Sequence, residues 1–171
     1  AVDAVRGPVR WGICGTGAIA RQFVDGLAQV PDAELVAVAS RDGERAASFA
    51  SAHDVPRAHV GTAALADDVD VDVVYVATTQ DRHVDDVCTL VRGGRSVLCE
   101  KPFALSLADA QRMCAAARDE GVFLMEAMWS RFLPSYRRLA ELLAQRIIGR
   151  PQLVEANFAI SVPADQRRVH R

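Results

Sequence analysis

Long apolar runs are missing from this 171-residue sequence. No apolar stretch reaches the about 18 residues that a membrane-spanning helix requires. The opening segment, AVDAVRGPVR, lacks the apolar core of a secretory signal. It also lacks an initiator Met, as a processed or incomplete chain would. These absences exclude an ordinary transmembrane helix and predict no membrane partner.

Disulfide and metal-binding patterns are missing as well. The four cysteines show no C-x-x-C spacing, and the four histidines show neither H-x-x-x-H nor H-E-x-x-H spacing. We therefore expect reduced thiols in a cytoplasmic protein and no metal site. Lys and Arg total 20 against 22 Asp and Glu, a formal net charge of −2. This balance argues against nucleic acid as a partner.

Apolar segments alternate with segments of helical spacing along most of the chain. The apolar segments predict strands at Val9–Cys14, 35–39, 71–77, Ser96–Cys99 and 122–125. The segments between and after them predict helices at 18–29, 44–53, 65–68, 81–91 and 105–120, the last with Ser106 as its N-cap. The strands lack polar alternation, which is typical of a sheet covered by helices on both faces. The sequence therefore predicts an α/β fold with a doubly wound parallel sheet of the Rossmann type.

The alternation ends near Ala127. A helix is predicted at 135–147, and the loosely alternating residues 152–160 predict an antiparallel strand. We therefore expect a dinucleotide-binding domain over residues 1–127 and the start of a second domain over residues 128–171. An unpaired apolar strand in that second part would invite pairing with another chain, so we expect a poor monomer.

The motif GTGAIA follows the first predicted strand and opens the first predicted helix. Gly15 permits a tight turn, Gly17 permits close approach of a pyrophosphate, and Ala20 stands where helix and strand pack closely. The phosphates would lie at the N-terminus of the helix, held by backbone N–H groups and the helix dipole. A chance turn is the alternative, but the strand–loop–helix context favours a dinucleotide site.

Ser40 and Arg41 end the second predicted strand, where NAD-preferring sites usually carry Asp or Glu. Together with Arg45, one helical turn later, they fit a 2′-phosphate, which a carboxylate would repel. The alternative is that these arginines are solvated and neutralised by Asp42 and Glu44. We favour phosphate recognition, and therefore NADP over NAD.

Polar residues also follow the predicted strand 71–77. Thr78 and Thr79 end it and His83 lies just beyond, at the edge of the sheet where ligands bind. The hydroxyl groups could meet a cofactor ribose. Capping of the next helix by Thr79 or Asp81 is equally consistent with the sequence.

A charged pair, Glu100 and Lys101, ends the predicted strand Ser96–Cys99 and precedes Pro102. A positively charged nicotinamide beside Lys101 would favour its neutral amine, which can exchange a proton with a substrate hydroxyl. A structural contact between Glu100 and Lys101 is the alternative.

Aromatic residues cluster at the predicted domain junction, in MEAMWSRF. Trp129 and Phe132 could line an apolar pocket, with Arg131 as a polar contact. Core packing is the commoner role of such a cluster, and these residues alone favour it.

Five segments, taken in order, carry a family resemblance: RWGICGTGAIA, AVASRDGERA, VVYVATTQDRH, VLCEKPFAL and FLMEAMWSRFLPSYRRL. They resemble the glucose–fructose oxidoreductase/inositol dehydrogenase (Gfo/Idh/MocA) family, above all its branch of dihydrodiol dehydrogenases and NADP-dependent xylose dehydrogenases. The resemblance extends from Val9 to about Phe158. It implies a Rossmann domain followed by an α/β domain whose open sheet forms a substrate pocket and often a homodimer interface.

The resemblance also implies roles for individual residues. The pyrophosphate would be held by Gly15, Thr16, Gly17, Ala18 and Ile19, and the 2′-phosphate by Ser40, Arg41 and Arg45. The nicotinamide side would be lined by Thr78, Thr79, His83 and Glu100, with Lys101 as the catalytic lysine. The aromatic positions of the substrate pocket match Trp129 and Phe158, with Arg131 nearby.

We therefore expect an NADP-dependent dehydrogenase that transfers a hydride to or from a carbinol carbon of a sugar, polyol or dihydrodiol. In the family a motif similar to GGGALLDxGxY follows and carries further catalytic residues; this sequence stops at Arg171, before it. The alternatives are a fragment or diverged member that binds NADP only and, less favoured, an NADP-sensing module. The 171-residue chain itself is expected to bind cofactor with little or no turnover.

Overall fold

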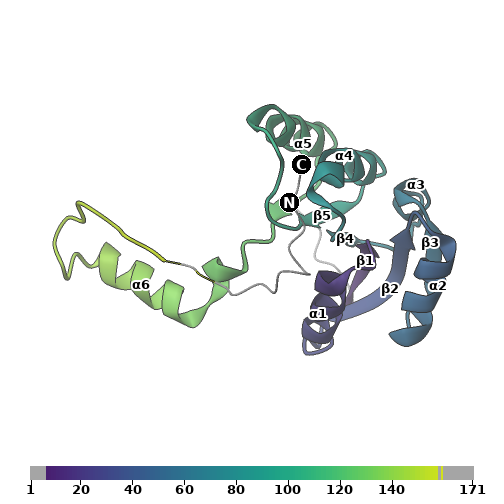
Figure 1. Ribbon diagram of the computed structural model, residues 1–171, viewed down its shortest axis with the longest axis horizontal. Coiled ribbons are helices and arrows are strands. Elements are labelled where there is room, and N and C mark those ends of the chain that lie inside the picture. The colour runs from purple at the N-terminus through teal and green to yellow at the C-terminus, as the bar shows by residue number, and fades with distance from the viewer. Residues whose placement is uncertain (1–6, 158, 160–171) are drawn as a thin grey trace. The chain divides into compact units, whose positions relative to one another are not determined.

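The structure is a computed structural model that describes residues 7–157 and residue 159. The chain divides into two compact units, Ala1–Met128 and Trp129–Arg171. Strands and helices alternate throughout the described part of the first unit (Figure 1).

One six-stranded sheet forms the centre of the first unit, in the order β3-β2-β1-β4-β5-β6. Its strands are β1 (Val9–Cys14), β2 (Ala33–Ser40), β3 (Arg57–Val60), β4 (Val73–Val76), β5 (Ser96–Cys99) and β6 (Leu124–Glu126). Every pairing between neighbours is parallel. The chain winds outward from β1 in one direction and from β4 in the other. The doubly wound parallel sheet predicted from the sequence is therefore confirmed.

Helices connect the strands and cover both faces of the sheet (Figure 1). They are α1 (Ala18–Leu27), α2 (Gly43–Ala52), α3 (Thr62–Ala66), α4 (His83–Arg92) and α5 (Leu107–Asp119), with a short 3₁₀ helix, η1 (Gln80–Arg82), before α4. The predicted N-cap of α5 is confirmed, because the Ser106 hydroxyl accepts a hydrogen bond from the Asp109 N–H at 3.1 Å.

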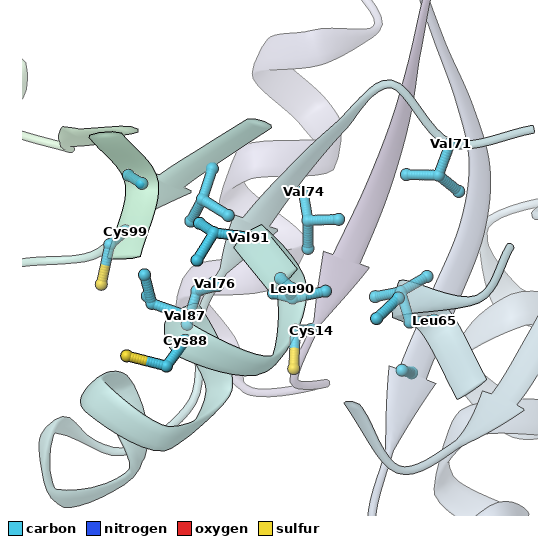
Figure 2. Close-up of a cluster of buried hydrophobic side chains, with 14 of the residues drawn as sticks. Cys14, Leu65, Val71, Val74, Val76, Val87, Cys88, Leu90, Val91 and Cys99 are labelled. Atoms are coloured by element: carbon cyan, nitrogen blue, oxygen red, sulfur yellow. The ribbon is translucent and has the colours of Figure 1, made fainter. Parts of the chain in front are cut away.

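Two hydrophobic clusters form the core, one on each face of the sheet. The larger cluster joins Leu65 of α3, Leu90 of α4 and Met113 of α5 to the sheet. Figure 2 shows part of this cluster, including Val74 and Val76 of β4 and Leu90 and Val91 of α4. The other cluster includes side chains from α1 and α2. Successive residues of β4 alternate between the clusters, as the two-residue period of a strand requires. This core fixes the carboxyl ends of the strands relative to one another.

The structure departs from the predicted elements in two places. The edge strand β3 had no predicted residues, because it is short and alternates half-buried with exposed side chains. The strand predicted at 152–160 is wrong for residues 152–157, which have no regular structure. A strand needs a partner for its backbone groups, and the described residues of the second unit offer none.

The second unit contains a 3₁₀ helix, η2 (Trp129–Phe132), and the helix α6 (Pro134–Ala144). Pro134 stands in the first turn of α6, where its missing N–H costs nothing. Along the described part of the chain, every helix is too short or too polar to cross a bilayer.

Candidate cofactor-binding site

The loops that follow β1, β2, β4 and β5 meet at the carboxyl edge of the sheet. The winding direction reverses between β1 and β4, and doubly wound sheets bind ligands in the crevice outside such a reversal. Of the residues predicted to contact cofactor in the first unit, Ser40 is the last residue of β2, and all the others belong to these four loops or to the helices that follow them.

Gly15 makes the turn out of β1. Its backbone has φ +107°, a conformation that favours glycine. A Cβ atom there would lie 2.8 Å from the Ala77 carbonyl oxygen, which is backbone and cannot swing away. The Gly15 N–H donates to the Ala39 carbonyl at 2.8 Å, so the turn is fixed between β2 and the end of β4. The turn therefore excludes any side chain at this position.

Gly17 shows the opposite environment. A Cβ added to it would meet no protein atom within 4 Å, so open space lies beside the loop. Gly17 is also the N-cap of α1, and no side chain caps that helix. The free N–H groups of the first turn and the positive end of the helix dipole therefore face this space. Such an arrangement fits an anionic group such as a pyrophosphate.

Thr16, between the two glycines, supports the same interpretation. Its side chain is only 6% exposed, and its hydroxyl has no hydrogen-bond partner among the described residues. A buried hydroxyl that makes no hydrogen bond lowers the stability of the fold. The Thr16 hydroxyl would gain its missing hydrogen bond if a ligand bound at this loop supplied an acceptor. Ala20 is fully buried where α1 packs on the sheet, as predicted for the third position of the motif.

The end of β2 carries no carboxylate that is free to bind a ribose. The Asp42 side chain caps α2 by accepting hydrogen bonds from the N–H groups of Glu44, at 2.9 Å, and Arg45, at 3.2 Å. Neither Arg41 nor Arg45 forms an ion pair within the described residues. Both guanidinium groups are exposed and remain available to an anion. Their exposure agrees with the alternative of solvated arginines as well as with phosphate recognition, but neither arginine is paired with Asp42 or Glu44.

The ends of β2 and β4 lie on either side of the end of β1 in the sheet. The pKa of Asp81, in the loop after β4, is lowered by the Thr79 side chain first and also by the positive charges of Arg82 and Arg41.

The Thr78 hydroxyl donates a hydrogen bond to the carboxylate of Asp86 at 2.9 Å. Asp86 is 3% exposed and also accepts from the Thr62 hydroxyl, at 2.7 Å, and from Arg82, at 3.5 Å. Because its proton is committed to Asp86, Thr78 can offer only its lone pairs to a ligand. Sequence reasoning missed Asp86, although an acidic residue on the buried face of an apolar helix was the signal that could have revealed it.

His83 is 1% exposed and sits behind the crevice. Its ring nitrogens contact the carbonyl oxygens of Pro102, at 3.0 Å, Phe103, at 3.3 Å, and Thr78, at 3.2 Å. The imidazole therefore ties the loop after β4 to the loop after β5. This bridge holds the segment that carries Lys101.

Two glutamates also hold that segment. The buried carboxylate of Glu100 accepts from the Tyr75 hydroxyl at 2.7 Å and from the Lys101 backbone N–H at 2.9 Å. Burial and the hydrogen bond to Glu100 raise the pKa of Tyr75, which keeps it a neutral donor. Glu126, at the end of β6, accepts from the Phe103 N–H at 2.9 Å. Glu126 was not among the predicted site residues.

The Lys101 side chain itself is exposed, and the Lys101–Pro102 peptide bond is cis. Within the described residues Lys101 forms no ion pair. The alternative, a structural contact between Glu100 and Lys101, is present as the hydrogen bond from the Lys101 backbone N–H, and it does not involve the ammonium group. The backbone around Lys101 is fixed by the contacts above, while its ammonium group remains free to meet a substrate.

Two cysteines of the first unit, Cys14 and Cys99, do not suit nucleophilic chemistry. Cys14 and Cys99 are buried, and burial raises the pKa of the Cys14 thiol to about 12. Burial and the neighbouring Glu100 likewise raise the pKa of Cys99. These thiols act as small core side chains.

The predicted pocket residues belong to the second unit. Trp129 is 56% exposed and Arg131 is exposed, both within η2. Neither is buried in a core, which was the alternative for this aromatic cluster. Phe158 lies outside the described residues.

Comparison with known proteins identifies the family of this chain. Residues 9–128 match the model of the GFO_IDH_MocA oxidoreductase family, described as having an NAD-binding Rossmann fold. The chain belongs to this family. The resemblance inferred from the five sequence segments is therefore confirmed.

Relatives within the family point to the same branch. The chain is 43% identical over 164 residues to a trans-1,2-dihydrobenzene-1,2-diol dehydrogenase from Xenopus laevis, and 41% identical over 163 residues to the Sus scrofa enzyme of that name. These alignments cover 95% and 94% of this chain but 50% and 49% of the relatives. The chain therefore spans about half the length of these curated family members.

A solved structure similar to this chain contains a cofactor. A 3-ketoreductase from Actinomadura kijaniata, solved in complex with NADP, superposes with a TM-score of 0.75 at 34% identity. The match covers 84% of this chain and 46% of the ketoreductase. The first unit thus has the fold of a structure in which NADP is bound.

Proposed function

We propose that the first unit binds NADP(H) in the crevice at the carboxyl edge of its sheet, in preference to NAD(H). The observation that carries the proposal is the loop Gly15–Thr16–Gly17, with its open space, uncapped helix and unpartnered buried hydroxyl. Backbone groups from Gly15 to Ile19 would hold the pyrophosphate.

The preference for NADP rests on the end of β2. Ser40 and Arg41 stand there in place of an acid, and the Asp42 carboxylate is occupied with capping α2. Ser40, Arg41 and Arg45 would bind the 2′-phosphate. The NADP bound to the ketoreductase from Actinomadura kijaniata supports this assignment.

On the other side of the crevice, Thr78, Thr79, Glu100 and Lys101 would line the nicotinamide, with His83 holding their loops together. When bound, the cofactor supplies or accepts the hydride. Lys101 would hold or release the proton of the substrate hydroxyl, because its amine is exposed at the ligand edge and its backbone is fixed by Glu100.

We further propose that the complete protein is a dehydrogenase acting on a carbinol carbon of a dihydrodiol, sugar or polyol. The name of the Xenopus laevis relative favours a cyclic dihydrodiol among these. Trp129, Arg131 and Phe158 would contribute to its substrate pocket, and the complete protein would form a homodimer.

A chain that binds NADP without turnover is the second candidate, because the chain spans about half the length of the dehydrogenases to which it is similar.

Titration of the 171-residue chain with NADPH and NADH tests cofactor binding, and assays of the chain and of a full-length relative with dihydrodiols and sugars test catalysis. We expect NADPH to bind more tightly than NADH. Tighter binding of NADH would refute the cofactor assignment, and binding without turnover by the chain alone would favour the second candidate.

A further inference from the structure

A cavity of about 370 Å³ adjoins the phosphate loop and is lined by residues from α1 and α2. It is lined by Thr16 of the loop, by Arg21 of α1, and by residues of α2 that include Glu44, Arg45 and Phe49. Thr16 is thus shared by the phosphate loop and the cavity. The two spaces are therefore neighbours, and a ligand in the crevice can extend into the cavity.

Arg21 had no role in the sequence prediction. It stands in the second turn of α1 and contributes a guanidinium to the cavity wall, as Arg45 does from α2. No ion pair engages either arginine within the described residues. Two cations on separate helices therefore line one cavity without a protein anion to neutralise them directly.

The carboxylates of the cavity wall are unequal. Asp42 has its side chain turned to the N-terminus of α2, where one oxygen accepts two backbone N–H groups. Glu44 is exposed and makes no side-chain hydrogen bond within the described residues. Of the two carboxylates that line the cavity, Glu44 is therefore the one whose negative charge no hydrogen bond offsets, and it would repel a bound anion.

We propose that Arg21 is a specificity-determining residue, which binds the 2′-phosphate of NADP together with Arg45, and that Glu44 limits the affinity. The inference rests on the proposed NADP-binding function. Arg21 and Arg45 line the same cavity from different helices, and two guanidinium groups can match the several oxygens of a phosphate monoester. Thr16, which belongs to the phosphate loop, also lines this cavity, so a dinucleotide that is bound at the loop lies next to both arginines.

The test measures dissociation constants of the 171-residue chain for NADPH, NADH, 2′,5′-ADP and 5′-AMP. Arg21→Gln should raise the dissociation constants for NADPH and 2′,5′-ADP by about 10-fold, the lower range for a hydrogen bond to a charged group. The dissociation constants for NADH and 5′-AMP should stay within about twofold of those of the unaltered chain. Glu44→Gln should lower the dissociation constants for NADPH and 2′,5′-ADP by about two- to threefold. Arg118→Gln, an equal change of charge on α5, should alter none of the four.

Two results would overturn the inference. An Arg21→Gln chain that binds like Arg118→Gln, while Arg41→Ala still loses NADPH selectively, would remove Arg21 from the site and leave the NADP proposal intact. If Arg21→Gln weakened the binding of NADPH and NADH equally, Arg21 would contact a portion of the dinucleotide that both cofactors share and not the 2′-phosphate. Unselective or NADH-preferring binding by the unaltered chain would instead refute the proposed function itself. Unchanged thermal unfolding midpoints would show that each variant remains folded.

Discussion

At the scale of single residues, the crevice is marked by groups that the fold leaves without protein partners. The Thr16 hydroxyl is buried and unpaired among the described residues, and the Arg41 and Lys101 side chains are exposed at the ligand edge. The Lys101 backbone, in contrast, is fixed by Glu100, while Thr16 and Arg41 directly follow Gly15 and Ser40, whose backbones are bonded to or paired within the sheet. Fixed backbones with free polar ends are what a preorganised binding site requires.

Arg41→Ala should weaken NADPH binding far more than NADH binding. A charge-assisted contact contributes about 1.5–3 kcal/mol, which corresponds to a factor of about 10–150 in the dissociation constant. Fluorescence titration of both cofactors measures it. Equal losses for the two cofactors would show that Arg41 does not contact the 2′-phosphate.

Lys101→Met in a full-length relative should lower kcat by about 10²–10⁴-fold, the usual contribution of a positioned acid or base. NADPH affinity should change little, because the backbone contacts of Glu100 and His83 remain. Steady-state kinetics and a cofactor titration measure the two effects. A near-normal kcat would show that Lys101 does not transfer the proton and that its role is structural.

Sequence reasoning singled out residues whose motifs are contiguous, such as Gly15–Gly17 and Glu100–Lys101. It passed over Asp86 and Glu126, whose contacts are with residues distant in the chain, and Arg21, which we propose for the site. Asp86, for example, becomes a site residue only because Thr62 and Thr78 donate to it from the ends of two other segments. No local spacing encodes such a convergence.

At the scale of elements, the two glycines of the phosphate loop, Gly15 and Gly17, have different structural roles. Gly15→Ala should destabilise the fold by about 1–3 kcal/mol or more, because its φ is positive and its Cβ would meet the Ala77 carbonyl. Gly17→Ala has room for its Cβ and an ordinary φ of −77°, so the fold should stay stable while pyrophosphate approach is hindered. Urea unfolding and NADPH titration of the two variants separate these effects. Normal cofactor binding by a folded Gly17→Ala chain would contradict the placement of the pyrophosphate.

The amino ends of β1 and β4 are joined by the Arg10–Asp72 pair. Its N···O distances are 2.8 and 3.1 Å, and the hydrogen bond from Arg10 lowers the pKa of Asp72. A lowered folded-state pKa gives a stabilisation that is present above the unfolded value of about 3.9 and is lost as pH falls through the folded value. Arg10→Gln should therefore destabilise the chain near pH 7 and progressively less below about pH 4. Urea unfolding over this range measures the difference, and a constant difference at every pH would contradict the account.

The elements themselves were predictable where hydrophobic periodicity was strong. β1 and β5 have the predicted bounds, because each is a short apolar run between clear turn residues. β3 was missed since half of its side chains face solvent at the edge of the sheet. The strand expected at 152–160 is not formed at residues 152–157, because alternation alone cannot supply a pairing partner.

At the scale of the whole molecule, the first unit contains every element that a dinucleotide crevice needs. The sheet, both core clusters and all four ligand-edge loops lie within Ala1–Met128. Cofactor binding is thus a property of this unit, whereas catalysis on a carbinol substrate is proposed for the complete protein.

Amide hydrogen exchange on the 171-residue chain, with and without NADPH, tests the central claim most directly. The first-turn amides of α1 lack intrahelical partners, so a bound pyrophosphate should slow their exchange. We predict protection at residues 15–20, 40–45 and 78–83, and little change at 69–72 on the opposite edge of the sheet. Protection confined to that opposite edge, or none at a saturating NADPH concentration, would contradict the account.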